Sequence, residues 1–279
     1  MRHEKIFDTW GEKLYVDSYE ELMAIDSSVL SKMVINRNLI VIKGLSSNLL
    51  DEEFYELGNK FGKTWSQEDY RKSFITRGID PTIDKTTNYP VSYFKTDNNM
   101  FKNTYMGYHA DMPHINDMSY PGRALYMVNN TEDGSGDTTW LNLELGWQQL
   151  SQEEQDKYSE CEVVFQDFYV PGTRMEKLSF VKTNPHTGKS SPRINCFALN
   201  DDRRAWISHI VKNNVELTFD QTGKIIRQLY QLLETKQDTL YTHVWTEGDI
   251  IVYDNWFNVH KREKVNGKRL LKRLTFNIP

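Results

Sequence analysis

A histidine and an aspartate stand two residues apart in Tyr108-His109-Ala110-Asp111, and this spacing constrains the fold more than any other feature of the chain. In an extended segment, residues i and i+2 point to the same face, so both side chains can reach one ion. A third candidate ligand, His260, ends an apolar run of strand character far downstream. Two histidines and one aspartate form the facial triad that leaves coordination positions open on non-haem Fe(II). We therefore predict that His109, Asp111 and His260 hold iron.

The tripeptide alone is a weak signal, because a His-x-Asp sequence arises easily by chance and is usually surface loop. Three further segments accompany it, at residues 134–140, 253–255 and 269–273. The order and spacing of the four segments resemble the taurine dioxygenase and clavaminate synthase-like branch of the Fe(II)/2-oxoglutarate oxygenases, over roughly residues 35 to 279. The resemblance implies a β-rich α+β fold with a double-stranded β-helix (jelly roll) core and flanking helices.

The resemblance also implies roles for residues around the metal. In the resembling enzymes, the threonine of a G-G-D-T-x-W stretch hydrogen-bonds the distal carboxylate of 2-oxoglutarate; here it is Thr138, with Ser135 in place of the first glycine. In an R-x-x-x-R pattern, the first arginine holds that carboxylate and the second approaches the acidic group of the substrate. These are Arg269 and Arg273. The reverse assignment stays open, because the loop after His260 is shorter than in several relatives.

The arginine pair is also consistent with the local pattern of the sequence. Residues 269–276 read as a strand, so positions 269, 271 and 273 share a face and both arginines can point inward. A buried carboxylate needs a paired cation, and the planar fork of arginine supplies it best. The alternative is a solvated basic strand that includes Lys268 and Lys272, but it accounts poorly for the leucines of the same segment.

A site of this kind uses Fe(II), 2-oxoglutarate as co-substrate, and O2. We therefore predict a dioxygenase that oxidises a C–H bond of a small amino-acid-like or natural-product substrate and releases succinate and CO2. Hydroxylation, desaturation and cyclisation all stay open, because they differ only in how the substrate is placed. Asn88 lies in the region from which relatives often reach toward substrate, so it is a candidate substrate-binding residue.

Three other functions compete with this prediction. A halogenase of the same fold lacks the carboxylate ligand so that chloride can bind, and the presence of Asp111 argues against it. A non-enzymatic metal-binding jelly-roll module would make the ligands and the arginine pair coincidences. Zinc hydrolysis with the same ligands would leave Thr138, Arg269 and Arg273 without a role.

Length and composition set the broad class. The 279 residues are common for one elaborated β domain, so we expect a single domain over residues 1–279. No apolar run marks secretion or membrane insertion, and the two cysteines form no framework, which together predict a cytoplasmic protein. A net charge of -5 without long blocks of one sign argues against nucleic acid as a partner. The oligomeric state is left open.

Periodicity predicts several local elements. Residues 18–35 read as a helix that begins at a capping box and places Leu22, Ile25, Val29 and Met33 on one face. The continuous apolar run 39–42 predicts a strand buried on both faces. Other segments read as a helix over 51–61 that stops at Gly62, a short helix after Ser151, a β-rich insertion over 162–200 and a helix over 221–235.

Two predictions concern segments near the ligands. Residues 64–104 lack periodicity and run directly into the first two ligands, so we expect an active-site lid there rather than a disordered loop. The strand at 240–245 contains His243, a weaker candidate ligand. In the resembling family this strand supports the barrel and the metal histidine comes later.

Overall fold

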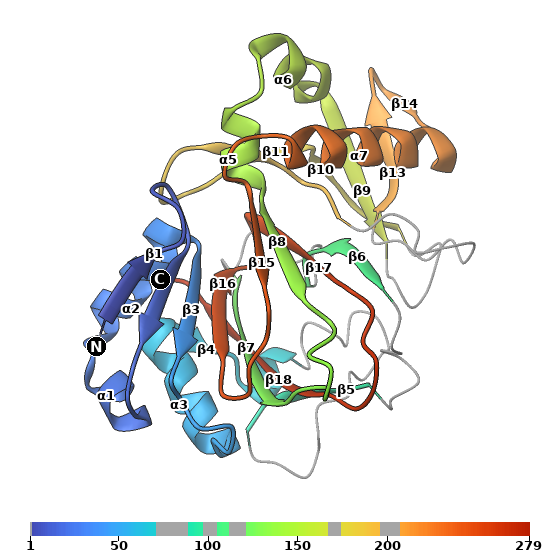
Figure 1. The fold of residues 1–279 in the computed structure, drawn as a ribbon. Coiled ribbons are helices and arrows are strands. Elements are labelled where there is room, and N and C mark those ends of the chain that lie inside the picture. The colour runs from blue at the N-terminus through green and yellow to red at the C-terminus, as the bar shows by residue number, and fades with distance from the viewer. Residues whose placement is uncertain (1, 71–88, 97–104, 112–120, 167–173, 196–206) are drawn as a thin grey trace.

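A computed structural model describes the chain over residues 2–70, 89–96, 105–111, 121–166, 174–195 and 207–279. Most of the predicted lid lies outside these residues, as does Asn88. The described chain combines sheets with helices that gather in two groups (Figure 1). No helix in these ranges has the length and apolar character needed to cross a membrane.

The largest sheet in the described chain has eight strands, in the order β1, β2, β3, β16, β7, β18 and β4, with β5 also paired to β18. Its pairs are antiparallel except β2 with β3. The strand bounds are β1 Arg2–Lys5, β2 Glu12–Tyr15, β3 Leu39–Lys43, β4 Lys63–Thr64, β5 Ser92–Lys95, β7 Pro121–Asn129, β16 Ile250–Asp254 and β18 Leu270–Asn277.

A second sheet has the order β15, β8, β17 and β6 and carries the two histidines of the predicted triad. Its strands are β6 Met106–His109, β8 Thr138–Asn142, β15 Leu240–His243 and β17 Asn258–Arg262. Trp140 on β8 shares a buried apolar cluster with Leu125, Ile251 and Leu271 of the large sheet. The two sheets therefore face each other, and a core lies between them.

The N-terminal helices cover the other side of the large sheet (Figure 1). Their bounds are α1 Tyr19–Ala24, α2 Ser27–Arg37 and α3 Asp51–Phe61. Val34 of α2 and Phe54 of α3 lie in one buried cluster with Val252 and Leu274 of the sheet. The predicted end of α3 at Gly62 is confirmed.

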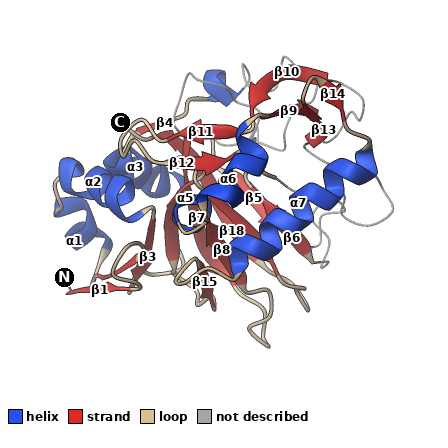
Figure 2. Ribbon diagram, turned by 90° about the horizontal axis from the view of Figure 1, so that it is seen from above, coloured by secondary structure: helices blue, strands red, loops and turns tan. Residues whose placement is uncertain are grey.

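A further layer packs on the outside of the second sheet and is seen from above in Figure 2. Leu141 and Val259 of that sheet share a buried cluster with Phe165 and Leu229 of this layer. In the described residues its four-stranded sheet consists of β10 Arg174–Ser179, β9 Cys161–Gln166, β13 Ile207–Lys212 and β14 Val215–Glu216. A two-stranded hairpin consists of β11 Val181–Thr183 and β12 Ser190–Pro192. The helices are α5 Leu143–Gln148, α6 Gln152–Ser159 and α7 Phe219–Glu234.

Most of the local predictions agree with these elements. The run at 39–42 is fully buried, as expected of a strand covered on both faces. The helix predicted over 221–235 is α7, and the capping box at Ser151 begins α6. α7 was recognised by its apolar periodicity and buries one face, whereas α6, which has no buried residue, was recognised by its capping box alone.

The single helix predicted over residues 18–35 is wrong, because the segment forms two helices. Ser18 does cap α1, but the helix ends at Ala24 and Asp26 starts α2 by accepting a hydrogen bond from the Ser28 backbone N–H at 2.7 Å. The break rotates the second helix, so that its buried residues are Leu30 and Val34 and the predicted core residue Val29 is 44% exposed. An aspartate that can cap a new helix outweighed the apolar spacing.

Replacing the cap that starts α2 gives a test of this break. Asp26→Ala removes the acceptor for the Ser28 N–H, so we expect the free energy of unfolding to fall by about 1 kcal/mol. Urea unfolding followed by circular dichroism measures the change. Lys32→Ala, on an exposed position of the same helix, is the control and should shift it by only a few tenths of a kcal/mol. Equal unfolding midpoints for the two variants would contradict a capping role.

Candidate active site

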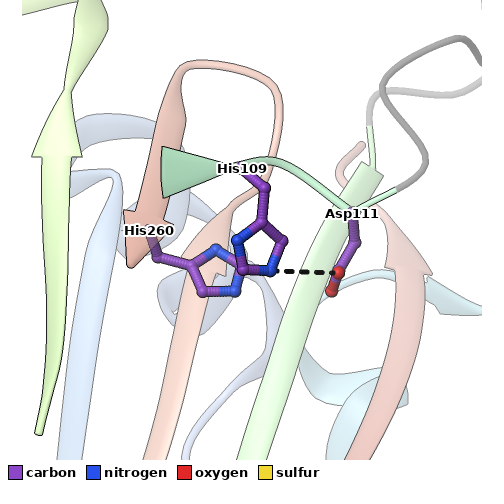
Figure 3. Close-up of side chains that lie close together, drawn as sticks. All are labelled: His109, Asp111 and His260. Atoms are coloured by element: carbon purple, nitrogen blue, oxygen red, sulfur yellow. Dashed lines mark ion pairs between the residues drawn. The ribbon is translucent and has the colours of Figure 1, made fainter. Parts of the chain in front are cut away.

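The three predicted metal ligands lie together at the edge of the second sheet (Figure 3). β6 and β17 are antiparallel neighbours in which His109 is paired with His260, and the two ring centroids are 4.2 Å apart. Asp111 lies two residues beyond His109, and its Oδ1 is 4.0 Å from His109 Nε2. One donor atom from each residue lies within 4.8 Å of the others. The spacing of the donors is suited to a single ion.

The hydrogen bonds and surroundings of the histidines suit them to bind a cation. His109 Nδ1 lies 2.8 Å from the carbonyl oxygen of Gly107. A carbonyl only accepts, so Nδ1 carries the proton and the lone pair is on Nε2, which faces Asp111. The ring of His260 packs against Trp140 and Tyr253. Burial lowers the pKa of His109. Burial and the nearby His109 ring also lower the pKa of His260, so both rings are neutral at neutral pH.

The carboxylate of Asp111 lies between the histidines and two arginines. Arg273 Nη1 is 2.7 Å from Asp111 Oδ2, and Arg123 Nε is 3.8 Å from the same atom. Burial alone would raise the pKa of this carboxyl. The charge of Arg273 outweighs burial and holds the pKa below its usual range, with further contributions from the two imidazoles, when they are protonated at low pH, and from Arg123. Asp111 is therefore ionised and available as a ligand.

Arg123 is a site residue that the sequence reasoning missed. Its charged side chain is fully buried, because it belongs to β7, whose first seven residues are all buried. The signal was a lone charge at the start of an apolar strand, which in a buried position requires a partner. Its guanidinium also donates to the Asp111 backbone carbonyl, at 3.4 Å.

A small cavity of about 90 Å³ joins the metal cluster to the last strand, β18. Arg269, immediately before β18, and Leu271 and Arg273 within it all line the cavity, which confirms that alternate residues of this segment face inward. Lys272 points to the opposite face, where its Nζ is 2.9 Å from Asp51. The solvated basic strand is therefore excluded. The remaining lining residues are Phe94, Met106, His109, Asp111, Leu125, Thr138, His260 and Arg262.

Arg269 presents unused hydrogen-bond donors at one end of this cavity. The residue is only 4% exposed, and its Nη1 donates to the carbonyl of Gly136 at 2.6 Å. Within the described chain, its buried Nε and Nη2 have no acceptor. Burial and the nearby charge of Arg262 lower the pKa of Arg269 to about 9. Both features are what a site for an anionic, forked acceptor such as a carboxylate would show.

Thr138 and Arg269 share one neighbour, Trp245, which the sequence reasoning did not single out. The indole Nε1 donates to Thr138 Oγ1 at 2.9 Å, and the Arg269 guanidinium lies 5.5 Å from the centroid of the Trp245 ring. An indole N–H only donates, so the hydroxyl proton of Thr138 is free to donate elsewhere. The indole thus contacts the two residues that the resemblance linked to the distal carboxylate.

The weaker candidate ligand His243 is not part of the metal cluster found in the described residues. Its Nε2 lies 2.9 Å from Asp249, and its Nδ1 lies 2.9 Å from the hydroxyl of Tyr241. Both ring nitrogens are therefore occupied within the protein. The choice of His260 over His243 agrees with this arrangement.

The fold and the donor set define a non-haem iron oxygenase. The family model "Taurine catabolism dioxygenase TauD, TfdA family" matches residues 3–275, so the chain belongs to the TauD/TfdA family. This membership confirms the predicted family and the class of 2-oxoglutarate-dependent iron dioxygenase, with Fe(II), 2-oxoglutarate and O2 as cofactors. No curated protein matches the chain.

Solved structures agree on the β-rich α+β fold. A taurine dioxygenase from Burkholderia xenovorans is 17% identical with a TM-score of 0.71, and the match covers 99% of this chain and 90% of that one. PvcB from Pseudomonas aeruginosa is 16% identical with a TM-score of 0.70 and coverages of 99% and 91%. A second PvcB structure, described as an Fe, alpha-ketoglutarate dependent oxygenase from an isonitrile synthetic pathway, has a TM-score of 0.69, 16% identity and the same coverages.

The close approach of Gly136 to Arg269 gives a test of this end of the cavity. A Cβ at position 136 would lie 2.5 Å from Arg269 Nη1, so Gly136→Ala should displace the guanidinium and weaken 2-oxoglutarate binding about ten-fold or more. Equilibrium titration of the Fe(II)-loaded protein under anaerobic conditions measures the constant.

Gly134→Ala is the matched control for Gly136→Ala. Both glycines have a positive φ, of 69° at Gly134 and 96° at Gly136, so both substitutions strain the backbone. A Cβ at position 134, however, has no atom within 4 Å. Gly134→Ala should lower stability and leave 2-oxoglutarate binding unchanged. Equal binding defects would show that backbone strain, rather than the collision with Arg269, is responsible.

Proposed function

We propose that this chain is an Fe(II)- and 2-oxoglutarate-dependent dioxygenase that oxidises a C–H bond of a small amino-acid-like or natural-product substrate, with release of succinate and CO2. One observation supports it above the others. The His109, Asp111 and His260 cluster opens into the same cavity as the buried, partly unsatisfied guanidinium of Arg269. A metal cluster and a carboxylate site in one cavity are what this co-substrate requires.

In this proposal His109, Asp111 and His260 are the iron ligands. The donor set of two neutral imidazoles and one carboxylate suits Fe(II) and leaves coordination positions for other ligands. When bound, the iron supplies the site at which 2-oxoglutarate and O2 react to oxidise the substrate. The protein holds the ligand atoms in place: Gly107 fixes the tautomer of His109, and Trp140 packs against His260.

Arg269 and Thr138 bind the distal carboxylate of 2-oxoglutarate. Arg269 offers two buried donors in a planar fork. The hydroxyl oxygen of Thr138 already accepts from the indole N–H of Trp245, so its proton can be donated to the carboxylate. Pairing with a carboxylate would satisfy a guanidinium that is otherwise costly to bury. These contacts support Arg269 rather than Arg273 as the co-substrate arginine.

Arg273 is assigned to the acidic group of the substrate. It lies four residues after Arg269, which immediately precedes β18, so in an extended segment their Cα atoms are roughly 13 Å apart at ~3.3 Å per residue. Its guanidinium contacts Asp111 and lies 4.5 Å from the ring centroid of Phe94. The two arginines can therefore serve different anions in one cavity. Asn88 stays a predicted substrate residue on the predicted lid over 64–104.

The fold enters the proposal as well. We assign the two facing sheets to a double-stranded β-helix within a single domain over residues 1–279, flanked by the helical layers. The shared core between Trp140 and Leu271 supports this assignment. A cytoplasmic location also stays a prediction.

The competing functions fit the site less well. A halogenase would need the position of Asp111 free for chloride, but this carboxylate lies within the cluster. A zinc hydrolase with the same ligands would leave the buried donors of Arg269 without an anion. No observation favours a non-enzymatic module for a member of a dioxygenase family.

One experiment tests the proposal directly. The pure protein is mixed anaerobically with Fe(II) and 2-oxoglutarate, and the absorption from charge transfer between iron and chelated 2-oxoglutarate is recorded. Candidate amino acids and related natural products are then screened for a change in this absorption, and succinate is measured after air is admitted. A colourless mixture that yields no succinate would refute the proposal.

Loss of a ligand should abolish metal binding. Mn(II) at about 100 times its Kd should stabilise the unmodified protein by about 2.7 kcal/mol, because it binds only the folded state. His109→Ala, Asp111→Ala and His260→Ala should each lose this stabilisation and all turnover. Thermal unfolding with and without Mn(II) measures it. The exposed His186→Ala variant is the control and should retain it; full stabilisation in any ligand variant would exclude that residue as a ligand.

The two arginines are separated by Arg→Lys changes, which keep the charge and lose the fork. Arg269→Lys should weaken the carboxylate contact by roughly 1–3 kcal/mol, and so raise the apparent constant for 2-oxoglutarate about ten-fold or more. Arg273→Lys should leave that constant, and substrate-independent succinate formation, nearly unchanged. Both are read from succinate formed at varied 2-oxoglutarate concentrations. The opposite pattern would reverse the assignment and leave the iron site intact.

A further inference from the structure

The backbone of the segment that carries Asp111 is paired by side chains instead of by a strand. β6 ends at His109, so the peptide groups of Ala110 and Asp111 have no strand partner. Asn195 accepts from the Ala110 N–H at 3.3 Å and donates to the Ala110 carbonyl at 3.0 Å. Asn255 does the same for Asp111, at 3.0 and 2.8 Å. Each amide therefore holds both polar groups of one residue.

Both amides are buried, which makes these bonds consequential. Asn195 is 0% exposed and Asn255 is 2% exposed, so water does not readily replace either side chain. Buried backbone groups are almost always paired, and an asparagine amide offers one acceptor and a donor in the same plane, as a peptide does. An aliphatic side chain supplies neither group and an aspartate supplies no donor. An asparagine can thus pair with the backbone N–H and carbonyl of one residue beyond the end of β6, as a neighbouring strand would.

The two asparagines come from different parts of the fold. Asn195 follows β12 of the outer hairpin, and Asn255 lies in the turn that joins β16 to β17. β17 carries His260, so the side chain of Asn255 links the backbone of one candidate ligand to the strand that carries another. Asp111 and His260, which are distant in sequence, are therefore connected through Asn255.

The position of Asp111 needs such support because strong charges act on it. Arg273 lies 2.7 Å and Arg123 3.8 Å from the same carboxylate oxygen, Oδ2, whereas the other oxygen is 4.0 Å from His109 Nε2. Rotation of the backbone at Ala110 would let the carboxylate follow the arginines and leave the histidines. The hydrogen bonds to the N–H and carbonyl groups of Ala110 and Asp111 oppose this rotation, and the peptide group between the two residues is held by both asparagines.

We propose that Asn195 and Asn255 are positioning residues of the metal centre, which keep the carboxylate of Asp111 directed toward the ion that His109 and His260 share. The proposal rests on the proposed function, since it takes these three residues as the ligands. Neither asparagine touches the ion. Outer partners of this kind usually change metal affinity by about 10- to 100-fold, so loss of either amide weakens metal binding without removing a ligand.

Mn(II) affinity tests the proposal without any need for turnover. Free Mn(II) is measured by its electron paramagnetic resonance signal in titrations of the full chain, for the unmodified protein, Asn255→Ala and Asn195→Ala. We expect both variants to bind Mn(II) with a Kd roughly 10-fold or more above that of the unmodified protein. Two variants are used because each releases the N–H and carbonyl of a different residue, Ala110 or Asp111, so that either one that folds gives a result.

Asn142→Ala is the matched control. Asn142 is 2% exposed, like Asn255, but its side chain accepts from the Leu145 N–H to cap α5. We expect this variant to lower the melting temperature and to keep the Mn(II) Kd of the unmodified protein.

The outcomes are distinct. Unchanged Kd values in the folded Asn195 and Asn255 variants, or an equal rise in Asn142→Ala, would overturn the positioning role and leave the iron site standing. Failure of the unmodified protein to bind Mn(II) would instead overturn the proposed function, and the positioning role with it.

Discussion

Buried positive charge is the constraint on which this site depends. The guanidiniums of Arg123, Arg269 and Arg273 are all largely buried, and Asp111 is the carboxylate among the residues that line the cavity. Burying a charge without a partner costs several kcal/mol in order of magnitude, so a fold tolerates such an excess only where it gains something else. In the proposed function, the dianionic co-substrate supplies the missing negative charge. The charge imbalance is thus a property of a binding site rather than of a stable core.

One strand connects this site to the rest of the molecule. Arg269, immediately before β18, and Arg273 within it face the cavity, and Lys272 on the other face of the strand pairs with Asp51 at the start of α3. The same strand therefore orients the two arginines and anchors a helix of the N-terminal layer. Movement of β18 would disturb the Lys272–Asp51 ion pair on one side and the cavity on the other, so the N-terminal helical layer is linked to the cavity through this strand.

The sequence predicted what depends on local spacing. Residues two apart in an extended segment share a face, so the spacing predicted that His109 lies beside Asp111 and that Arg269 and Arg273 face the same side; their choice as site residues came from the family resemblance. It did not predict contacts between residues far apart that have no motif of their own. Asn195 is an example, and so is the charge of Arg123, because an asparagine or arginine is ordinary on a surface. Asn255 belongs to the 253–255 segment of the resemblance, but its contact with the backbone of Asp111 was not predicted. The prediction of one helix over residues 18–35 failed for a local reason, because the preference of Asp26 to cap a new helix competed with the apolar periodicity.

Trp245 illustrates how an apolar residue can set the chemistry of a polar site. Its N–H can only donate, so its bond to Thr138 leaves the hydroxyl proton of that residue directed away from the indole. Its ring lies under the Arg269 guanidinium, while Gly136 takes one of the five guanidinium N–H groups. Phenylalanine would keep the ring and lose the donor, and Thr138 could then turn its proton toward another acceptor. Because both donors face one cavity end, the indole makes that end a site for acceptors, which suits a carboxylate and disfavours a cation or an apolar group.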